Sequence, residues 1–309
     1  MPPSSVSKRA QMFRLLALLV ITLVIVAFGL SRCGNFETED PDRFLVSEYG
    51  KRLLVVDYSG NVKQTFDLDV RDAGWSPDGD RIAYVDAQGN LGILGVESGH
   101  LTPLAVGTVT FNTMYLRWSP DGRYLAFIGM PEAEHWVIGL IQLTEPPTVT
   151  LYKSCEYECL EPDWLPDGHS LIYAEDLGVQ GEHLVTRVKK LDIKTGAVNT
   201  LFSTNHGMTA MRLSPDGTQL VLVAHGEHGA YYLSDLSGHL QSLPVSAADT
   251  LCWVSDGENL ALTDWSSAPS LATFIYNLEQ QAVRQLYPPR AILPVFEERS
   301  ANFVMLDCR

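Results

Sequence analysis

The chain has 309 residues, of which 46% are hydrophobic and 19% charged; this is enough apolar material for a core and excludes wholesale disorder. Its formal net charge is −15, and all 37 acidic residues lie beyond position 33, together with 18 basic ones. A surface this acidic repels phosphate groups, so we expect no nucleic-acid partner. Cationic peptides, metal ions and neutral ligands are compatible with the charge.

An apolar segment near the N-terminus predicts export from the cytoplasm. The run over residues 15–30 carries no charge, and extended to 12–31 it approaches the ~20 residues that span a bilayer. The basic residues 1–11 then form a short cytoplasmic tail, and residues 32–43 form a linker. We predict a single-pass membrane protein whose signal anchor holds the rest of the chain in the periplasm or at the cell surface.

Two other fates of this segment remain open. Residues 27–29 (Ala-Phe-Gly) resemble a small-x-small cleavage site, and cleavage there would give a secreted protein. Residues 30–33 resemble a bacterial lipobox, with Arg32 where a small residue belongs, and this would give a lipoprotein at Cys33. All three fates place the following residues outside the cytoplasm.

Five segments share a turn of the type Trp-Ser-Pro-Asp-Gly followed by an apolar strand, with small variations and with Leu in place of Trp in the fourth. Their Asp residues are spaced 43, 46, 49 and 40 residues apart. The turn and packing residues are Trp75, Asp78, Gly79, Trp118, Asp121, Gly122, Trp164, Asp167, Gly168, Asp216, Gly217, Trp253, Asp256 and Gly257. In each turn Pro sets φ, Asp caps the local backbone and Gly takes a positive φ. We expect the aspartates to cap turns around a ring rather than to converge on one calcium ion.

The repeat predicts the fold, because four short strands per 40–49 residues is the spacing of one propeller blade. Repeats near 73–106, 114–152, 160–202, 209–243 and 249–287 give five blades, and 44–68 with 291–306 give a sixth that joins the two ends. The predicted fold is all-β: a six-bladed β-propeller of four-stranded antiparallel blades over residues 44–309, preceded by a single N-terminal transmembrane helix.

These repeats resemble the TolB-type, WD40-like (PD40) β-propeller repeats, without the α/β domain that precedes the propeller in TolB. The resemblance covers about residues 45–305 and implies the fold. It implies little about function, because propellers host many unrelated activities. Similar propellers also cap prolyl-oligopeptidase-type peptidases, but the chain has no G-x-S-x-G motif.

Propeller topology sorts the histidines between two faces. The Ser-Pro-Asp-Gly turns and the turns between third and fourth strands share one face, here the short-turn face, and the remaining connections share the other, the long-loop face. His206, His225 and His228 fall on the long-loop face and are candidate ligands for zinc, manganese or iron. The alternative is that they are solvent-facing loop residues. Oligogalacturonate lyases are similar in fold and hold a metal through propeller histidines, but no motif of theirs is matched here.

The cysteines are interpreted through the exported compartment. Cys155 and Cys159 lie in one inter-blade loop, and a disulfide between them is favoured over a metal pair in an oxidising space. Cys252 and Cys308 either bridge adjacent blades or stay free.

The chain contains no G-x-G-x-x-G, HExxH or CxxC motif. We therefore expect a non-catalytic, membrane-tethered propeller without a cofactor, which binds a protein, peptide or glycan on its long-loop face. The alternative is a propeller enzyme, a lyase or hydrolase acting on a saccharide, that depends on a divalent transition metal.

Overall fold

The computed structural model describes residues 43–48, 50–57, 62–106, 115–129, 136–155, 158–181, 183–224, 230–246, 250–254, 256–264, 272–285 and 303–308. These residues belong to a compact unit that spans Asp42–Arg309. The predicted transmembrane segment 12–31 lies outside the described residues, and among those that are described no helix has the length and apolarity to cross a bilayer.

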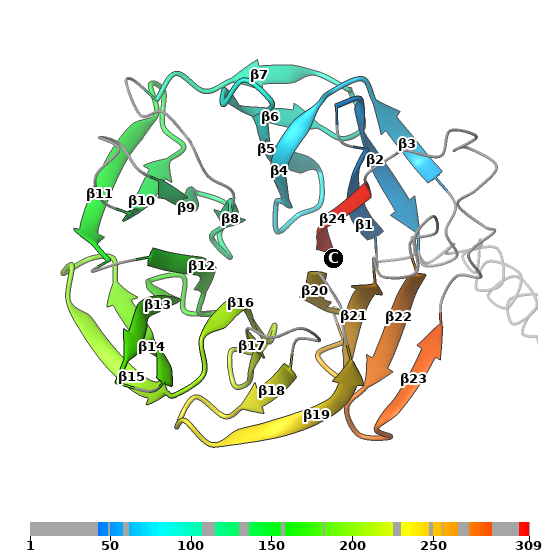
Figure 1. Cartoon of the computed structure of the whole chain (residues 1–309). Coiled ribbons are helices and arrows are strands. Elements are labelled where there is room, and N and C mark those ends of the chain that lie inside the picture. Colours follow the sequence, from blue (N-terminus) through cyan, green and yellow to red (C-terminus); the bar gives the residue numbers. More distant parts are fainter. Residues whose placement is uncertain are drawn as a thin grey trace, which may run out of the picture. The chain divides into compact units, whose positions relative to one another are not determined.

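The strands of the described part form six four-stranded antiparallel sheets, set around a ring (Figure 1). The prediction of an all-β, six-bladed propeller is confirmed. Blade 1 contains β4 (Val70–Trp75), β5 (Arg81–Asp86), β6 (Leu91–Gly95) and β7 (Leu101–Pro103). Blade 2 contains β8 (Arg117–Trp118), β9 (Tyr124–Gly129), β10 (Val137–Gln142) and β11 (Thr148–Ser154). Blade 3 contains β12 (Glu158–Trp164), β13 (Ser170–Gln180), β14 (His183–Asp192) and β15 (Val198–Thr204).

Blade 4 contains β16 (Met208–Leu213), β17 (Leu220–Ala224), β18 (Ala230–Ser234) and β19 (Leu240–Ser246). Blade 5 contains β20 (Thr250–Trp253), β21 (Asn259–Asp264), β22 (Ala272–Asn277) and β23 (Ala282–Gln285). The closing blade combines both ends of the ring: β24 (Phe303–Cys308) pairs antiparallel with β1 (Arg43–Glu48), followed by β2 (Arg52–Asp57) and β3 (Val62–Phe66). Strand β24 is therefore the innermost strand of the blade whose other three strands are β1, β2 and β3 (Figure 1).

The hydrophobic core is divided among the junctions between blades. Each of the six clusters found among the described residues combines side chains from two neighbouring blades. Strand β9 shows how one strand serves two junctions: Leu125 and Phe127 pack towards blade 1, whereas Ala126 and Ile128 pack towards blade 3. Because side chains alternate across a strand, a blade with apolar residues on both faces can only bury them by stacking on both sides.

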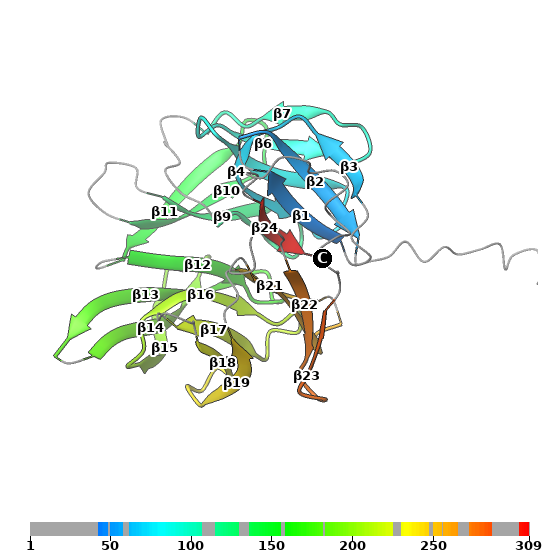
Figure 2. The same cartoon turned by 45° about the vertical axis from the view of Figure 1, so that its right-hand side comes forward.

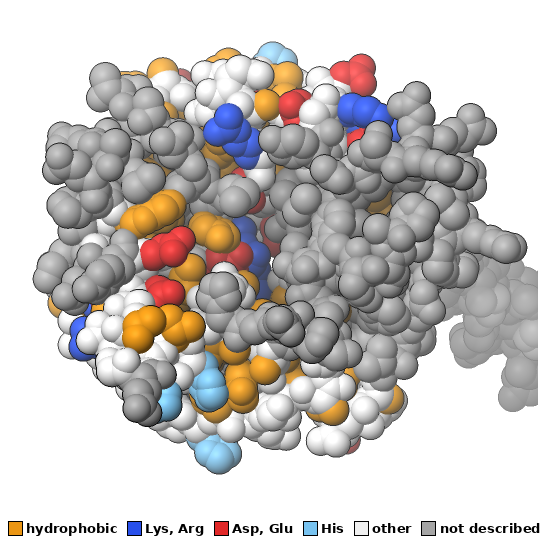
Figure 3. Space-filling view, in the orientation of Figure 1, with side chains coloured by type: hydrophobic (Ala, Val, Ile, Leu, Met, Phe, Trp, Pro, Cys, Tyr) orange, Lys and Arg blue, Asp and Glu red, His pale blue; other side chains and the backbone are white. Residues whose placement is uncertain are grey.

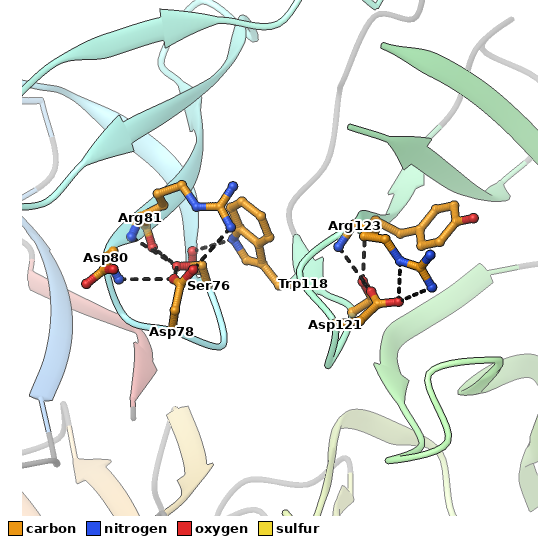
Figure 4. Close-up of polar contacts among 10 residues, drawn as sticks. Ser76, Asp78, Asp80, Arg81, Trp118, Asp121 and Arg123 are labelled. Carbon is orange, nitrogen blue, oxygen red and sulfur yellow. Dashed lines mark hydrogen bonds and ion pairs between the residues drawn. The ribbon is translucent and has the colours of Figure 1, made fainter. Parts of the chain in front are cut away.

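The Ser-Pro-Asp-Gly turns join the first and second strands of their blades. In blade 1 the carboxylate of Asp78 accepts hydrogen bonds from the hydroxyl of Ser76 and from the backbone N–H of Asp80, the latter at 3.1 Å (Figure 4). Gly79 has φ +75°, which a side chain would disfavour. The guanidinium of Arg81 lies 4.7 Å from the ring centroid of Trp118 in the next blade and contacts Asp78 at 3.3 Å (Figure 4). The turn thus stabilises its own blade and also packs against a neighbouring one.

Candidate binding site on the long-loop face

Charged side chains from five blades gather at the axis of the ring. They all lie on innermost strands, and Figure 3 shows acidic and basic side chains in the middle of the ring. This axial cluster consists of Asp72, Arg117, Glu161, Asp163, Arg212 and Asp307. Arg117 is only 8% exposed and interacts electrostatically with four carboxylates of the cluster, which come from three other blades. Burial alone would favour its neutral form, but these carboxylates raise the pKa of Arg117 above its ordinary value.

The acidic members of the axial cluster accept hydrogen bonds from the backbone of the next blade. Asp72 accepts from the N–H of Leu116 at 2.6 Å. Asp163 accepts from Leu213 at 2.9 Å. The innermost strand is the edge of its sheet, so the N–H groups on its free edge, away from the second strand, have no strand partner. The carboxylates accept hydrogen bonds from these groups. The axial cluster therefore holds neighbouring blades together.

Glu161 and Arg212 make the ion pair of the cluster, between blades 3 and 4. Their side chains are 9% and 13% exposed, so water screens the pair poorly. Burial is the largest influence on Asp72 and raises its pKa, while Arg117 and the two backbone N–H groups act in the opposite direction. The axis is thus a mixed acidic and basic environment with low access to water.

Tyr115 lies next to the axial cluster at the point where blade 2 begins. Its φ of +93° is unusual for a residue with a side chain, and its N–H donates a 2.5 Å hydrogen bond to Asp72. Burial, and then the negative charge of Glu161, raise the pKa of Tyr115 to about 12. The phenol is therefore a neutral hydrogen-bond donor at neutral pH. Backbone strain of this kind persists where surrounding contacts hold it, and Asp72 provides such a contact.

The second and third strands of blade 3 extend past the rest of the ring. Strands β13 and β14 have 11 and 10 residues, whereas the other second strands from β5 to β21 have five or six. Five additional residues lengthen the hairpin by ~15 Å. Figure 2 shows the end of this hairpin protruding at the lower left. We call its described residues 177–181 and 183–184 the arm; it lies on the long-loop face because it joins the second and third strands.

The arm carries exposed apolar side chains. Val179 is 67% exposed and pairs with Leu184, which is 36% exposed. Leu184 in turn packs against Gly207, where an added Cβ would approach its Cδ1 to 2.9 Å. At the base of the arm the exposed Glu158 is in register with Asp176. The long-loop face of blade 3 thus combines an apolar projection with two carboxylates.

The predicted metal-ligating histidines are only partly described. His206 is exposed on the long-loop face, and its ring stacks on that of Tyr232, with centroids 5.1 Å apart and planes inclined by 24°. His225 and His228 lie outside the described residues. Within the described part of the chain no three His, Cys, Asp or Glu side chains are grouped so that they could hold a metal ion. The metal site therefore stays a prediction.

A disulfide spans the connection between blades 2 and 3, from Cys155 just after β11 to Cys159 on β12. Cys155 and Cys159 are joined, with their Cα atoms 5.6 Å apart, and both are buried in the cluster between the two blades. Cys252, for which the sequence allows either a disulfide or a free thiol, is also disulfide-bonded.

The fold and these features define a six-bladed propeller with a charged axis and one long hairpin. No family model matches the chain, so its membership of the PD40 repeat family stays a prediction. The uncharacterized peptidase YuxL of Bacillus subtilis is 33% identical over 131 residues, which are 40% of this chain and 19% of that protein. The chain thus spans about a fifth of the length of this curated relative.

Solved structures are similar at the level of fold. TolB from Acinetobacter baumannii has a TM-score of 0.63 and 17% identity, covering 78% of this chain and 62% of that one. TolB from Agrobacterium tumefaciens has a TM-score of 0.60 and 17% identity, covering 80% and 88%. An oligogalacturonate lyase in complex with manganese has a TM-score of 0.55 and 14% identity, covering 76% and 70%. The chain therefore has a TolB-like propeller fold, and identities this low carry the fold alone.

Sequence reasoning did not find the arm or the axial cluster. The arm had one signal: the spacing from Asp167 to Asp216 is 49 residues, the longest of the four. The axial cluster had a weaker one, since Asp72 and Glu161 each stand three residues before the repeated Trp. Closing the ring is what brings these separate positions together.

Proposed function

We propose that this chain is an exported, membrane-tethered propeller that binds a protein or peptide partner on its long-loop face, with the arm as the main contact. The observation that carries the proposal is Val179, a β-branched apolar side chain that is 67% exposed on a hairpin longer than its counterparts. Contact with a partner would remove the neighbouring side chains of Val179 and Leu184 from water, which favours binding. The β13–β14 ladder resumes after a register shift between Asp176 and Val179 and pairs Val179 with Leu184, which limits the entropy lost on binding.

The chemistry around the arm indicates the kind of partner. Glu158 and Asp176 lie side by side at its base, and the chain beyond position 33 is strongly acidic. A partner segment with apolar and basic side chains complements this surface, and the charges would speed its association. The disulfide between Cys155 and Cys159 supports a location in an oxidising space, in keeping with export.

The first test is photo-crosslinking: a photo-reactive amino acid is incorporated at position 179 of the full-length chain, and the membranes of the producing cell are illuminated. The same amino acid at position 101 is the control, because Leu101 is 42% exposed but lies on the outermost strand of blade 1. We expect a partner protein that crosslinks from position 179 and not from 101.

Affinity for the purified partner then decides the proposal. Val179→Ser and Leu184→Ser should each weaken binding about tenfold, as truncation of a central interface residue does. Leu101→Ser should leave the affinity unchanged. Equal effects of all three substitutions, or a glycan as the only ligand that depends on Val179, would overturn the assignment of a protein partner to the arm.

A further inference from the structure

A concave site lies on the short-turn face, opposite the face that carries the arm. A cavity of about 470 Å³ is present between the outer strands of blade 2 and the turns of blade 3. On one side it is lined by Leu140 of β10 and Tyr152 of β11. On the other it is lined by His169 of the Ser-Pro-Asp-Gly-type turn and Lys194 of the β14–β15 turn. Both turns belong to the short-turn face, so this site is separate from the proposed partner surface.

The lining is basic although the chain is acidic. Arg123, His169 and Lys194 all line the cavity, and no Asp or Glu does, in a chain with 37 acidic and 22 basic residues. The carboxylates of the turns that border the cavity, Asp121, Asp167 and Asp192, are hydrogen-bonded within their own turns. Asp121 holds Arg123 at 2.6 Å, and Asp192 accepts hydrogen bonds from the backbone N–H groups that follow it. Lys194 is exposed, and its ammonium group makes no ion pair within 4 Å in the described part of the chain, although Asp192 interacts with it electrostatically.

The remaining lining residues suit a ring-shaped molecule with hydroxyl groups. Tyr152 donates a 2.7 Å hydrogen bond from its hydroxyl to the carbonyl oxygen of Ile193, which fixes its ring across the junction. Burial, and then Tyr124 and Asp192, raise the pKa of Tyr152, so this wall stays neutral. Gln142 supplies an amide donor and acceptor beside it. Flat aromatic walls with amide partners and a cavity of this volume are common in small-molecule sites.

We propose that this cavity binds a small organic anion: a ring compound, such as a sugar, that carries a carboxylate or a phosphate group. The anionic group lies against His169 and Lys194, and the ring lies against Tyr124 and Tyr152. Arg123 contributes to the positive potential but stays paired with Asp121. The basic side chains would then supply affinity for the anionic group, and the tyrosine rings would select ligands by the shape of their ring.

Binding of three probes to the full-length chain in detergent micelles tests the proposal by calorimetry. Glucuronate carries a carboxylate, glucose 6-phosphate carries a phosphate, and glucose is the neutral control. We expect at least one anionic probe to bind and glucose to bind at least tenfold more weakly. The stronger anionic probe identifies which anion the site prefers.

Substitutions locate the binding. Lys194→Gln and His169→Gln should each weaken the anionic probe about tenfold, the usual loss for a hydrogen bond to a charged group. Arg71→Gln is the matched control, since it removes an exposed cation from β4, away from the cavity. The proposal is wrong if neither anionic probe binds, if glucose binds equally well, or if Arg71→Gln weakens binding as much as Lys194→Gln. Circular dichroism of each variant confirms that the propeller is folded.

Discussion

The indole Nε1 of Trp118 donates a 3.0 Å hydrogen bond to the carbonyl oxygen of Gly74, on the innermost strand of the preceding blade. The same relationship recurs twice. Trp164 donates to the carbonyl of Arg117, and Trp253 donates to the carbonyl of Arg212, each at 3.0 Å. Each acceptor directly precedes the Trp or Leu of its own repeat. In these three repeats the Trp therefore satisfies an edge carbonyl of its neighbour as well as filling the junction between blades, whereas the buried Nε1 of Trp75 has no such partner among the described residues.

Trp118→Phe should destabilise the propeller by about 1–3 kcal/mol, because the buried carbonyl of Gly74 loses its donor while most of the ring packing is retained. Urea unfolding followed by circular dichroism measures the change. Trp136→Phe is the control, since Trp136 is half-buried and its indole has no recorded hydrogen-bond partner in the described part of the chain. Equal losses for both variants would show that ring volume alone is responsible.

Asp72→Ala should cost about 3 kcal/mol, because it removes the oxygen that accepts from two buried backbone N–H groups and leaves Arg117 without one of its buried partners. Asp80→Ala should change stability little, since Asp80 is exposed in the turn of the same blade. The free energy of unfolding in urea gives both values. A loss below 1 kcal/mol for Asp72→Ala would mean that the axial cluster does not hold the blades together.

Two glycines in equivalent turns separate backbone strain from crowding. Gly168 has φ +64° with nothing within 4 Å of an added Cβ. Gly217 has φ +74°, and an added Cβ would overlap the ring of Pro166. Gly168→Ala should therefore cost about 1–2 kcal/mol from the left-handed backbone alone. Gly217→Ala should cost more, because it adds a steric overlap with the neighbouring blade. Thermal unfolding of the two variants side by side checks the order, and a reversed order would contradict the explanation.

The fold was predictable from sequence because its determinants are local. A Ser-Pro-Asp-Gly turn specifies a hairpin within a few residues, and its recurrence gives the blade period. The charged axis was not predictable in the same way, because Asp72, Arg117 and Glu161 are about 45 residues apart and meet only when the ring closes. The cavity was not predictable either, because it combines two tyrosines of blade 2 with a histidine and a lysine of blade 3 that share no motif.

Acid should weaken the propeller through its turn aspartates. The hydroxyl of Ser214, followed by the backbone N–H of Thr218, lowers the pKa of Asp216 below its usual 3.8. The pKa of Asp78 is lowered in the same way, first by the hydroxyl of Ser76. A carboxyl whose pKa is lowered by folding stabilises the fold above its unfolded pKa and loses that contribution as the pH falls through its folded pKa.

We therefore expect the urea midpoint to fall as the pH drops below about 4, where unfolded aspartates begin to take up protons. Asp216→Ala should be less stable than the natural chain at neutral pH and should show a shallower fall in acid. Parallel curves for the two proteins would assign the acid sensitivity to other groups. Asp72 has a raised pKa and acts with the opposite sign, so it does not account for a loss in acid.

Metal content separates a binding propeller from a metal-dependent enzyme. Because His206 stacks on Tyr232 and the proposed partner surface needs no ion, we expect the purified full-length chain to hold only substoichiometric zinc, manganese or iron. His225→Ala and His228→Ala should then leave both the metal content and the melting temperature unchanged. Elemental analysis after dialysis measures the first, and a thermal melt with and without chelator measures the second. One transition-metal ion per chain, lost in both variants, would contradict the proposal of a non-catalytic module and favour saccharide chemistry at these histidines.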